Sequence, residues 1–408
     1  MHTTLDAAEA DVMAQDIMDA ISAIIETHGE RPPGSAGERA CQRQLETELR
    51  AAGVPTRLEP FTVSQKAFMA MPMVCSVLTL CALPLYWVAP LLALAPVLAA
   101  AAVCVCELIF YRHVLAPFFP KQESVNLEAV VPARAERRRR ILFVGHADAA
   151  YEWNFLRCFP SIFPVFPIIT VLSTVYVLLT TAAAALLGGV PAVPGFWQWL
   201  GYSQLLAAPG LVLGLCYANF WRVAPGAGDN LSGALLATRF VQWMHTGKLA
   251  LDHTEVVALV TGSEEAGLVG ARAYIQAHKN ELDRIETAVV ALDTIAELQH
   301  LKVYTRDLNG RVHHDPRVSA LIRDAGREAC GLELPDGVVT VGASDAAAFT
   351  QAGVPAAALC AMDPAPAHYY HNRRDTPDVL EKEALAKTLQ LMARLCIRYD
   401  QQGLATPS

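Results

Sequence analysis

Two long stretches of the sequence contain no Asp, Glu, Lys or Arg, and they constrain the fold more than any other feature. The first runs from Ala67 to Cys106 and the second from Cys158 to Trp221. A membrane-spanning helix needs about 20 apolar residues, so each stretch is long enough for two. We therefore predict four transmembrane helices in two hairpins. The alternative, that both stretches are buried core, requires four charge-free helices to be hidden inside one soluble protein.

The two apolar stretches are predicted to be inserts in a single soluble domain. We assign residues 67–110 to the first transmembrane hairpin. The second hairpin occupies 158–221, with helices at about Phe163–Leu187 and Trp199–Trp221. The remaining segments, 1–66, 111–157 and 222–408, should form one domain. Strands on either side of an insert must pair in one sheet, so the chain has to cross the membrane an even number of times between them.

The flanking charges predict the orientation in the membrane. Basic residues flank the inserts on the side of the soluble domain, at Lys66, Arg112, Lys121, Arg157 and Arg222, whereas the two opposite loops hold no Lys or Arg. The positive-inside rule then places the domain in the cytoplasm. We expect an integral, multi-pass protein of the inner or plasma membrane. The ten Cys residues show no CxxC spacing, which agrees with a reducing compartment.

Outside the inserts, short apolar runs alternate with amphipathic segments. This alternation predicts an α/β domain with a mixed, mostly parallel central sheet sandwiched by helices. The 40 acidic residues outnumber the 32 basic ones, which argues against a nucleic-acid partner. Strands are expected at 56–63, 124–131, 141–145, 255–261, 287–293, 337–341 and 355–360. Helices are expected at 5–28, 38–52, 233–244, 266–278, 316–328 and 380–399.

Carboxylate and imidazole side chains follow the predicted strands or precede the predicted helices at five places. Ligands gather at the carboxyl ends of strands in open α/β sheets. Each place alone has an ordinary explanation, such as a helix N-cap for an isolated Asp, but five in one domain are poorly explained as independent structural residues. The five places are His146-Ala-Asp148, Gly226-Ala-Gly-Asp229-Asn-Leu-Ser-Gly233, Glu264-Glu265, Asp293 and His371-Asn-Arg-Arg-Asp-Thr-Pro377.

In the order and spacing of these motifs, the chain resembles the di-zinc aminopeptidase family, which includes glutamate carboxypeptidases and glutaminyl cyclases. The resemblance covers residues of about 15–65, 124–157 and 224–400, together with Arg31-Pro-Pro-Gly-Ser35 and Ser344-Asp345. It implies a zinc aminopeptidase/phosphorylase–hydrolase-like fold. The resemblance departs from the family pattern at Ala346, where the family often has His, and at Arg373 and Arg374, so it does not imply a substrate class.

The resemblance also implies a role for each motif residue. His146 and Asp293 would bind one Zn²⁺, Glu265 and His371 would bind a second, and Asp229 would bridge the two ions. Glu264 would be the general base, and Asp148 would orient His146. Nitrogen and oxygen ligands suit Zn²⁺, and metal-bound His commonly donates its other nitrogen to a carboxylate.

These observations predict a membrane-embedded di-zinc hydrolase that cleaves an amide bond, most simply an aminopeptidase on hydrophobic or membrane-associated peptides. One alternative is an amidase acting on N-acyl or lipid-linked amino acids, and another is a non-catalytic, receptor-like protein. We expect strands 56–63, 124–131 and 141–145 to be consecutive antiparallel neighbours, which would place both hairpins at the sheet edge that bears His146. The partners would then be the lipid bilayer and a hydrophobic peptide or amphiphilic amide.

Overall fold

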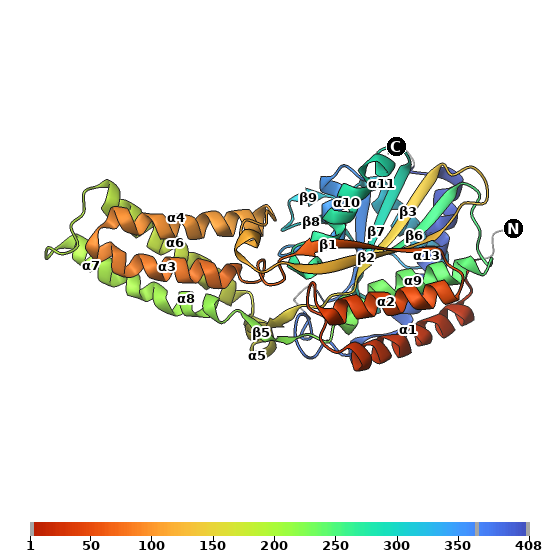
Figure 1. Ribbon diagram of the computed structural model, residues 1–408, viewed down its shortest axis with the longest axis horizontal. Coiled ribbons are helices and arrows are strands. Elements are labelled where there is room, and N and C mark those ends of the chain that lie inside the picture. Colours follow the sequence, from red (N-terminus) through yellow and green to blue (C-terminus); the bar gives the residue numbers. More distant parts are fainter. Residues whose placement is uncertain (1–3, 364–366, 405–408) are drawn as a thin grey trace. The chain divides into compact units, whose positions relative to one another are not determined.

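The computed structural model describes residues 4–363 and 367–404 and divides the chain into two compact units. Unit 1 comprises Met1–Gln65, Lys121–Ala150 and Val223–Ser408, and unit 2 comprises Lys66–Pro120 and Tyr151–Arg222. Figure 1 follows the chain by colour, and each unit combines segments that are distant in the sequence.

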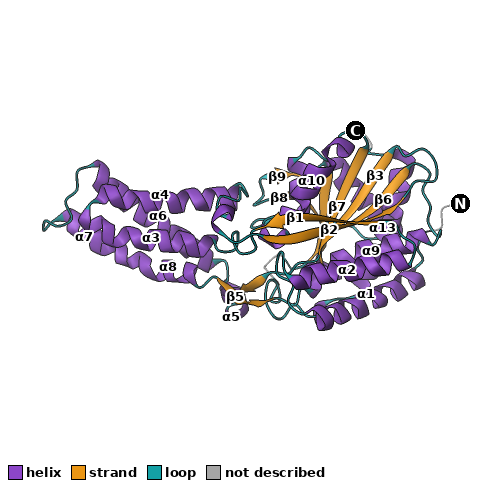
Figure 2. Ribbon diagram, viewed as in Figure 1, coloured by secondary structure: helices purple, strands orange, loops and turns teal. Residues whose placement is uncertain are grey.

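Unit 1 is built around a nine-stranded mixed sheet (Figure 2). Its strands are β1 (Thr56–Val63), β2 (Gln122–Val131), β3 (Arg139–His146), β6 (Thr254–Thr261), β7 (Glu286–Ile295), β8 (Leu301–Asp307), β9 (Val312–His313), β10 (Asp336–Val338) and β11 (Ala356–Ala361). The order is β1-β2-β6-β3-β7-β11-β8-β10, with β9 paired to β8. The adjacent strands β6, β3, β7 and β11 run parallel, whereas β2 is antiparallel to both neighbours.

Helices cover both faces of this sheet, which confirms the predicted α/β class. One face carries a large apolar cluster, to which β3 contributes Ile141 and Phe143. On the other face Tyr274 packs against Phe349. The helices of the first face are α1 (Ala7–His28), α2 (Ala36–Ala51), α9 (Gly233–His245), α11 (Pro316–Cys330) and α13 (Lys382–Gln402), and those of the second are α10 (Val269–Leu282) and α12 (Asp345–Gln351).

The predicted order of the first three strands is wrong, because β6 lies between β2 and β3. Every residue of β6 is buried, and a strand that is apolar on both faces belongs inside a sheet rather than at its margin. β1 still runs in the same direction as β6 and β3, since β2 is antiparallel to both β1 and β6. Val63 therefore lies at the same edge of the sheet as His146.

Unit 2 is a small helical bundle with a two-stranded ribbon. Apolar side chains from several helices, including Tyr86, Val97, Val177 and Leu211, are buried against one another in its core. Its helices are α3 (Met71–Val88), α4 (Pro90–Cys104), α5 (Asn154–Cys158), α6 (Val165–Leu186), α7 (Phe196–Ser203) and α8 (Ala208–Leu215), and its ribbon pairs β4 (Tyr151–Trp153) with β5 (Ala218–Val223).

Within the described residues, three helices are long and apolar enough to cross a membrane, not the predicted four: Met71–Val88, Pro90–Ile109 and Val165–Leu186. The expected fourth helix, Trp199–Trp221, is interrupted by the 3-10 turn Gln204–Ala207 and gives way to β5 at Ala218. Pro209 follows this turn in the first turn of α8. Because proline has no N–H to donate, it cannot continue a regular α-helical hydrogen-bond ladder through that point.

Candidate functional site

The site lies in unit 1, at the carboxyl ends of the parallel strands. His146 is the last residue of β3, and Glu264 and Glu265 form a short 3-10 turn just after β6. Asp293 lies near the end of the neighbouring strand β7. Since these three strands are adjacent and parallel, their ends bring residues far apart in the sequence to one edge of the sheet.

Four of the predicted ligands meet around the carboxylate of Asp229. His146 Nε2 lies 3.2 Å from Asp229 Oδ1, and His371 Nε2 lies 2.9 Å from Asp229 Oδ2. His371 Nε2 is also 3.1 Å from Glu265 Oε1. Atoms of His146, Asp229 and Glu265 lie within 4.8 Å of one another, close enough to share an ion. Asp229 thus stands between the two histidines, one on each carboxylate oxygen.

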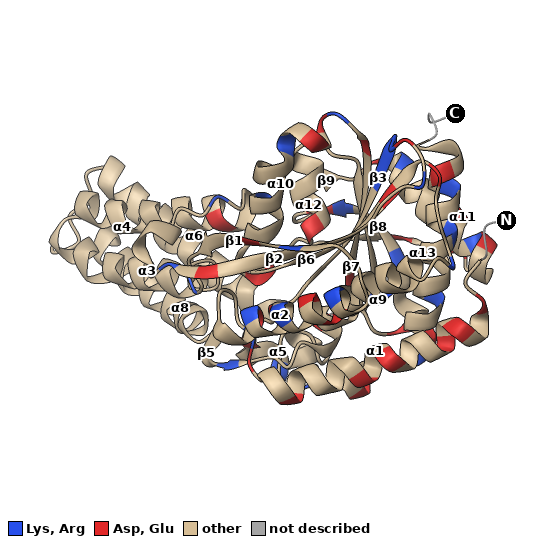
Figure 3. Cartoon of the chain, turned by 45° about the vertical axis from the view of Figure 1, so that its right-hand side comes forward, with Lys and Arg blue, Asp and Glu red and all other residues tan. Residues whose placement is uncertain are grey.

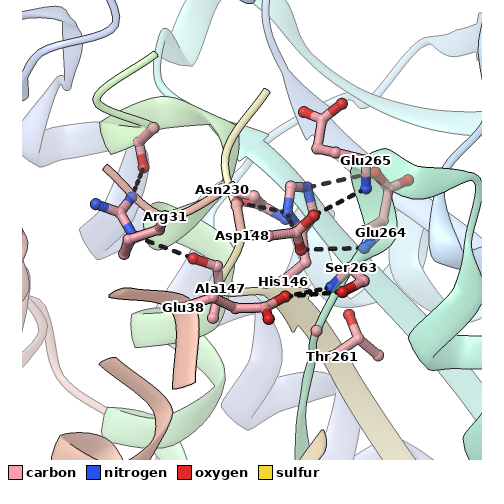
Figure 4. Close-up of polar contacts among 12 residues, drawn as sticks. Arg31, Glu38, His146, Ala147, Asp148, Asn230, Thr261, Ser263, Glu264 and Glu265 are labelled. Atoms are coloured by element: carbon pink, nitrogen blue, oxygen red, sulfur yellow. Dashed lines mark hydrogen bonds and ion pairs between the residues drawn. The ribbon is translucent and has the colours of Figure 1, made fainter. Parts of the chain in front are cut away.

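Glu264 and Asp148 lie beside this group (Figure 4). Glu264 Oε2 is 3.9 Å from His146 Nε2. Asp148 Oδ1 is 3.5 Å from His146 Nδ1, and the backbone carbonyl of Asp148 is 3.1 Å from the same nitrogen. The carboxylate of Asp148 accepts hydrogen bonds from the backbone amides of Glu264 and Glu265, both at 3.0 Å. Asp148 therefore holds the Glu264–Glu265 turn as well as contacting His146.

Asp293 is partly buried at the same edge, and its Oδ1 accepts a hydrogen bond of 2.9 Å from the Thr294 hydroxyl. Its carboxylate interacts electrostatically with Asp229 and His146. Asn230, next to Asp229, donates to the Leu292 carbonyl at 2.8 Å and accepts from the Thr294 amide at 3.2 Å. Asn230 thereby fastens the Asp229 loop to the end of β7.

Three non-glycine residues next to these side chains adopt left-handed backbone conformations. They are Ser263, Thr294 and His371, with φ of 56°, 50° and 48°. This region is uncommon for residues other than glycine, and especially for a β-branched one. Such conformations cluster where a surrounding network over-determines the geometry, as the hydrogen bonds around Asp148 and Asn230 do here.

The electrostatics of the site favour a bound cation. Burial raises the pKa of Asp293 to about 7, with a further contribution from Asp229, and burial also raises the pKa of Glu264 and Glu265. Burial alone would lower the pKa of His371, but Glu265 and Asp229 outweigh it and raise this pKa to about 10. Buried carboxylates in this number require a positive charge among them, and a metal ion can supply it.

The donor atoms fit a zinc ion. The site offers imidazole nitrogen and carboxylate oxygen, which are the usual ligands of Zn²⁺ outside thiolate sites. Asp229 Oδ2 and Glu265 Oε1 are buried and make no hydrogen bond of acceptable geometry, although His371 Nε2 lies within 3.1 Å of each. Oxygens left in this state inside a protein are well suited to hold an ion.

Several supporting residues carried no predicted role in the sequence. Asp375 accepts the amides of Gly228 and Asp229 at 2.7 and 3.0 Å. Arg31, fully buried, donates to the carbonyls of Ala147 and Pro225. Both belong to segments that carried the family resemblance, which was the available signal.

Glu38 and Asn126 are further supporting residues, and no motif in the sequence predicted a role at the site for either. Asn126 lies on β2, and its Oδ1 accepts the Gly262 amide at 3.1 Å. Glu38 stands three residues after Ser35, a spacing that indicates a helix N-terminal capping box. Ser35 does accept the amide of Glu38 at 3.1 Å. The carboxylate of Glu38 reaches across to Ser263 instead, which the capping pattern does not predict.

Comparison with known proteins agrees with this site. Residues 215–396 match the sequence family described as peptidase family M28. A search of curated proteins finds no match. Among solved structures, the chain resembles BSAP, a zinc aminopeptidase from Bacillus subtilis, at 15% identity with a TM-score of 0.56, covering 95% of this chain and 94% of that one.

Two further structures show the same fold. An aminopeptidase from Aneurinibacillus sp. strain AM-1 is 15% identical with a TM-score of 0.54, covering 99% of this chain and 95% of that one. A glutaminyl cyclase from Porphyromonas gingivalis is 12% identical with a TM-score of 0.54, covering 97% of this chain and 99% of that one.

The family match over residues 215–396, together with the fold, supports a zinc metallopeptidase. More narrowly, they support assignment of the chain to the di-zinc aminopeptidase family, the family that its five motifs resemble.

Proposed function

We propose that this protein is a membrane-embedded di-zinc hydrolase that cleaves an amide bond, most simply an aminopeptidase acting on hydrophobic or membrane-associated peptides. The observation that carries the proposal is one cluster of side chains: Asp229 lies 3.2 Å from His146 and 2.9 Å from His371. His371 also lies 3.1 Å from Glu265, and Glu264 lies 3.9 Å from His146. The residues come from four separate segments of the chain, so local sequence alone does not bring them together.

Each residue has a defined task in this proposal. His146 and Asp293 would hold one ion, Glu265 and His371 would hold the other, and Asp229 would be shared by both. When bound, two such ions polarise a carbonyl group and lower the pKa of water. Glu264 is the side chain left for proton transfer: it accepts a proton from the attacking water and delivers it to the departing amine.

The surface of unit 2 supports a membrane location. Leu91, Leu172 and Leu179 lie on two of its three candidate spans and are 60–69% exposed. These helices carry almost no charged residues (Figure 3). Exposed apolar surface is costly in water, at roughly 25 cal/mol per Å², whereas a bilayer covers it without this cost. The lipid bilayer is therefore the partner that we assign to unit 2.

The path of the chain supports four crossings. Unit 1 needs an even number of crossings in each insert, because the chain returns to the same sheet. α3 and α4 supply two in the first. In the second, α6 supplies one, and we assign the return to the interrupted segment Phe196–Leu215. Broken helices are tolerated in membranes where neighbouring helices satisfy the backbone. By the positive-inside rule, the flanking Lys and Arg support a cytoplasmic location for unit 1.

The attachment points of the inserts bear on the substrate. Gln65 and Lys121 connect to the edge of the sheet where β1 ends and β2 begins, and Ala150 follows closely after His146. The chain thus leaves unit 1 for the apolar unit 2 from the edge that bears the site. This connectivity favours an apolar or amphiphilic substrate over a small soluble dipeptide.

An amidase acting on N-acyl or lipid-linked amino acids is a second candidate. Arg373 and Arg374 are exposed and directly follow His371 and Asn372, and a guanidinium group is well suited to pair with a free carboxylate. A receptor-like protein without activity is disfavoured, because no expected ligand has been replaced.

The test is metal content and hydrolysis of the detergent-purified protein, with Glu264→Gln beside wild type. The substrates are aminoacyl amides and N-acyl amino acids of increasing chain length. We expect two zinc ions per chain in both proteins, and a loss of about 10²–10⁴-fold in kcat in the variant. Preference within the panel separates peptidase from amidase. Absence of zinc, or equal turnover in both proteins, would refute the proposed function, and rates that do not depend on chain length would refute the membrane-linked substrate.

A further inference from the structure

The turn that carries Glu264 and Glu265 is held by its backbone amides. Four consecutive amides, from Gly262 to Glu265, each donate to a side chain from another element. The Gly262 amide donates to Asn126 on β2, the Ser263 amide to Glu38 on α2, and the amides of Glu264 and Glu265 to Asp148 after β3. The position of both carboxylates is therefore set from outside the turn.

Among these supports, Glu38 makes the most contacts. Its Oε1 accepts from the Ser263 amide at 2.6 Å and from the Ser263 hydroxyl at 3.1 Å. Its Oε2 accepts from the Gly34 amide and the Ser124 hydroxyl, both at 2.8 Å. Glu38 is fully buried. One carboxylate thus joins the loop before α2, the start of β2 and the turn after β6. Figure 4 shows its contact with Ser263.

The conformation of Ser263 explains why this support is needed. Ser263 has φ 56° and ψ 39°. This left-handed conformation is energetically unfavourable for a residue other than glycine. Its neighbour Gly262 has no room for a side chain, because a Cβ there would collide with the Ser124 hydroxyl and the Val125 carbonyl. The turn is both strained and closely packed, so a hydrogen bond that fixes Ser263 also fixes the direction in which Glu264 and Glu265 leave the backbone.

We propose that Glu38 is a positioning residue for the general base Glu264 and the zinc ligand Glu265, acting through the backbone and hydroxyl of Ser263. This inference rests on the proposed function of the site. It assigns Glu38 no contact with substrate or metal. Residues that contact metal ligands without touching the metal typically contribute about 10–100-fold in metal affinity or activity.

The test compares Glu38→Gln with wild type and with Glu46→Gln. The first replacement keeps the volume of the side chain but turns one of its two acceptors into a donor, which must then face either Ser263 or Gly34. Glu46 lies on the same helix but away from the site, and it forms an ion pair with Arg50 at a distance of 2.8 Å. The readouts are zinc affinity, measured by competition with a chelating dye, and kcat and KM on the best substrate.

In Glu38→Gln we expect zinc affinity or kcat to fall by about 10–100-fold, with KM within about twofold of wild type. Glu46→Gln should match wild type. A purely structural role would lower the unfolding midpoint and leave zinc affinity and kcat per folded molecule unchanged, and that result would overturn the proposal.

If Glu38→Gln does not fold, Ser263→Ala is the second test, because it removes the hydroxyl contact alone. Wild-type zinc affinity and kcat in that variant would overturn the proposal. Failure of wild type to bind zinc or to turn over would instead refute the proposed function.

Discussion

Replacing Arg140 should strongly destabilise unit 1, because its charge is buried among carboxylates. Arg140 is the second residue of β3, and its side chain is 3% exposed. Its guanidinium contacts Glu128, Glu255 and Glu281 at 2.6, 3.0 and 2.9 Å. Glu128, 6% exposed, also accepts from the Tyr274 hydroxyl at 2.7 Å. The group forms a buried ion cluster at the opposite end of β3 from the site.

Arg140→Met leaves these carboxylates without their central cation. Breaking a buried ion pair by removing one partner costs about 3–5 kcal/mol, because a desolvated charge loses its partner. Glu128 keeps a contact with Arg57 at 2.9 Å, but Arg57 is 54% exposed and compensates only weakly. In a domain of this size each kcal/mol lowers the unfolding midpoint by about 2 °C, so we expect a fall of about 6–10 °C. Arg137 contacts Glu255 and Glu281 at 2.8 Å but is 37% exposed. Arg137→Met should therefore cost about 0–1 kcal/mol.

The assay is thermal unfolding of the purified protein in detergent, followed by near-ultraviolet circular dichroism at one detergent concentration for all variants. A second comparison tests the cause directly. The double variant Arg140→Met/Glu128→Gln also removes the buried charge of the Glu128 carboxylate. It should therefore unfold at a higher temperature than Arg140→Met alone. The reasoning is refuted if Arg140→Met and Arg137→Met have the same midpoint, or if the double variant is the less stable one.

Two other predictions concern pH and metal. The hydrogen bond that His278 donates to the Glu59 carboxylate raises the pKa of His278. His278 therefore stabilises the fold below its unfolded pKa of about 6.5 and loses this effect as pH rises through the folded pKa. The unfolding midpoint of wild type should therefore exceed that of His278→Gln, and this difference should be larger at about pH 5.5 than at about pH 9. A difference that is constant or grows with pH would contradict the assignment. Removing zinc with a chelator should lower the unfolding midpoint of wild type, because a ligand that binds the folded state stabilises it. Added Zn²⁺ should restore that midpoint, whereas Asp229→Asn should respond weakly to both treatments, and an equal response in the two proteins would place the stabilising metal elsewhere.

The sequence predicted most of unit 1 because local pattern and tertiary position agree there. β6 reads as a continuous apolar run, Glu255–Val260, and is fully buried. α1 repeats its buried residues at helical spacing, with Ile17, Ile21 and Ile24 inside. Strand β8 and helix α12 were missed. β8 begins with Leu-Lys-Val-Tyr-Thr-Arg, in which apolar and polar residues alternate only in part. α12 is only seven residues long.

The charge-free stretches show where composition stops being informative. Absence of charge from Cys158 to Trp221 indicated two helices of similar length, but it does not distinguish a continuous helix from an interrupted one. The structure has one long helix, α6, and a return path broken at Gln204–Ala207. Gln204 is buried there and donates to the hydroxyls of Thr180 and Thr181 at 3.0 and 3.2 Å. These contacts depend on the packing of α6 against the broken segment, which hydropathy does not encode.

The sequence by itself determined the class of fold, the positions of the strand ends and the residue types of the site, because these depend on local periodicity and on motifs of short range. The tertiary structure alone decided the insertion of β6 between β2 and β3, and the meeting of Asp229 with both histidines. It also decided the support of the Glu264–Glu265 turn by Glu38, Asn126 and Asp148. Strand order and hydrogen bonds between distant segments are set by how the whole sheet buries its apolar faces, and a single stretch of sequence carries no record of that choice.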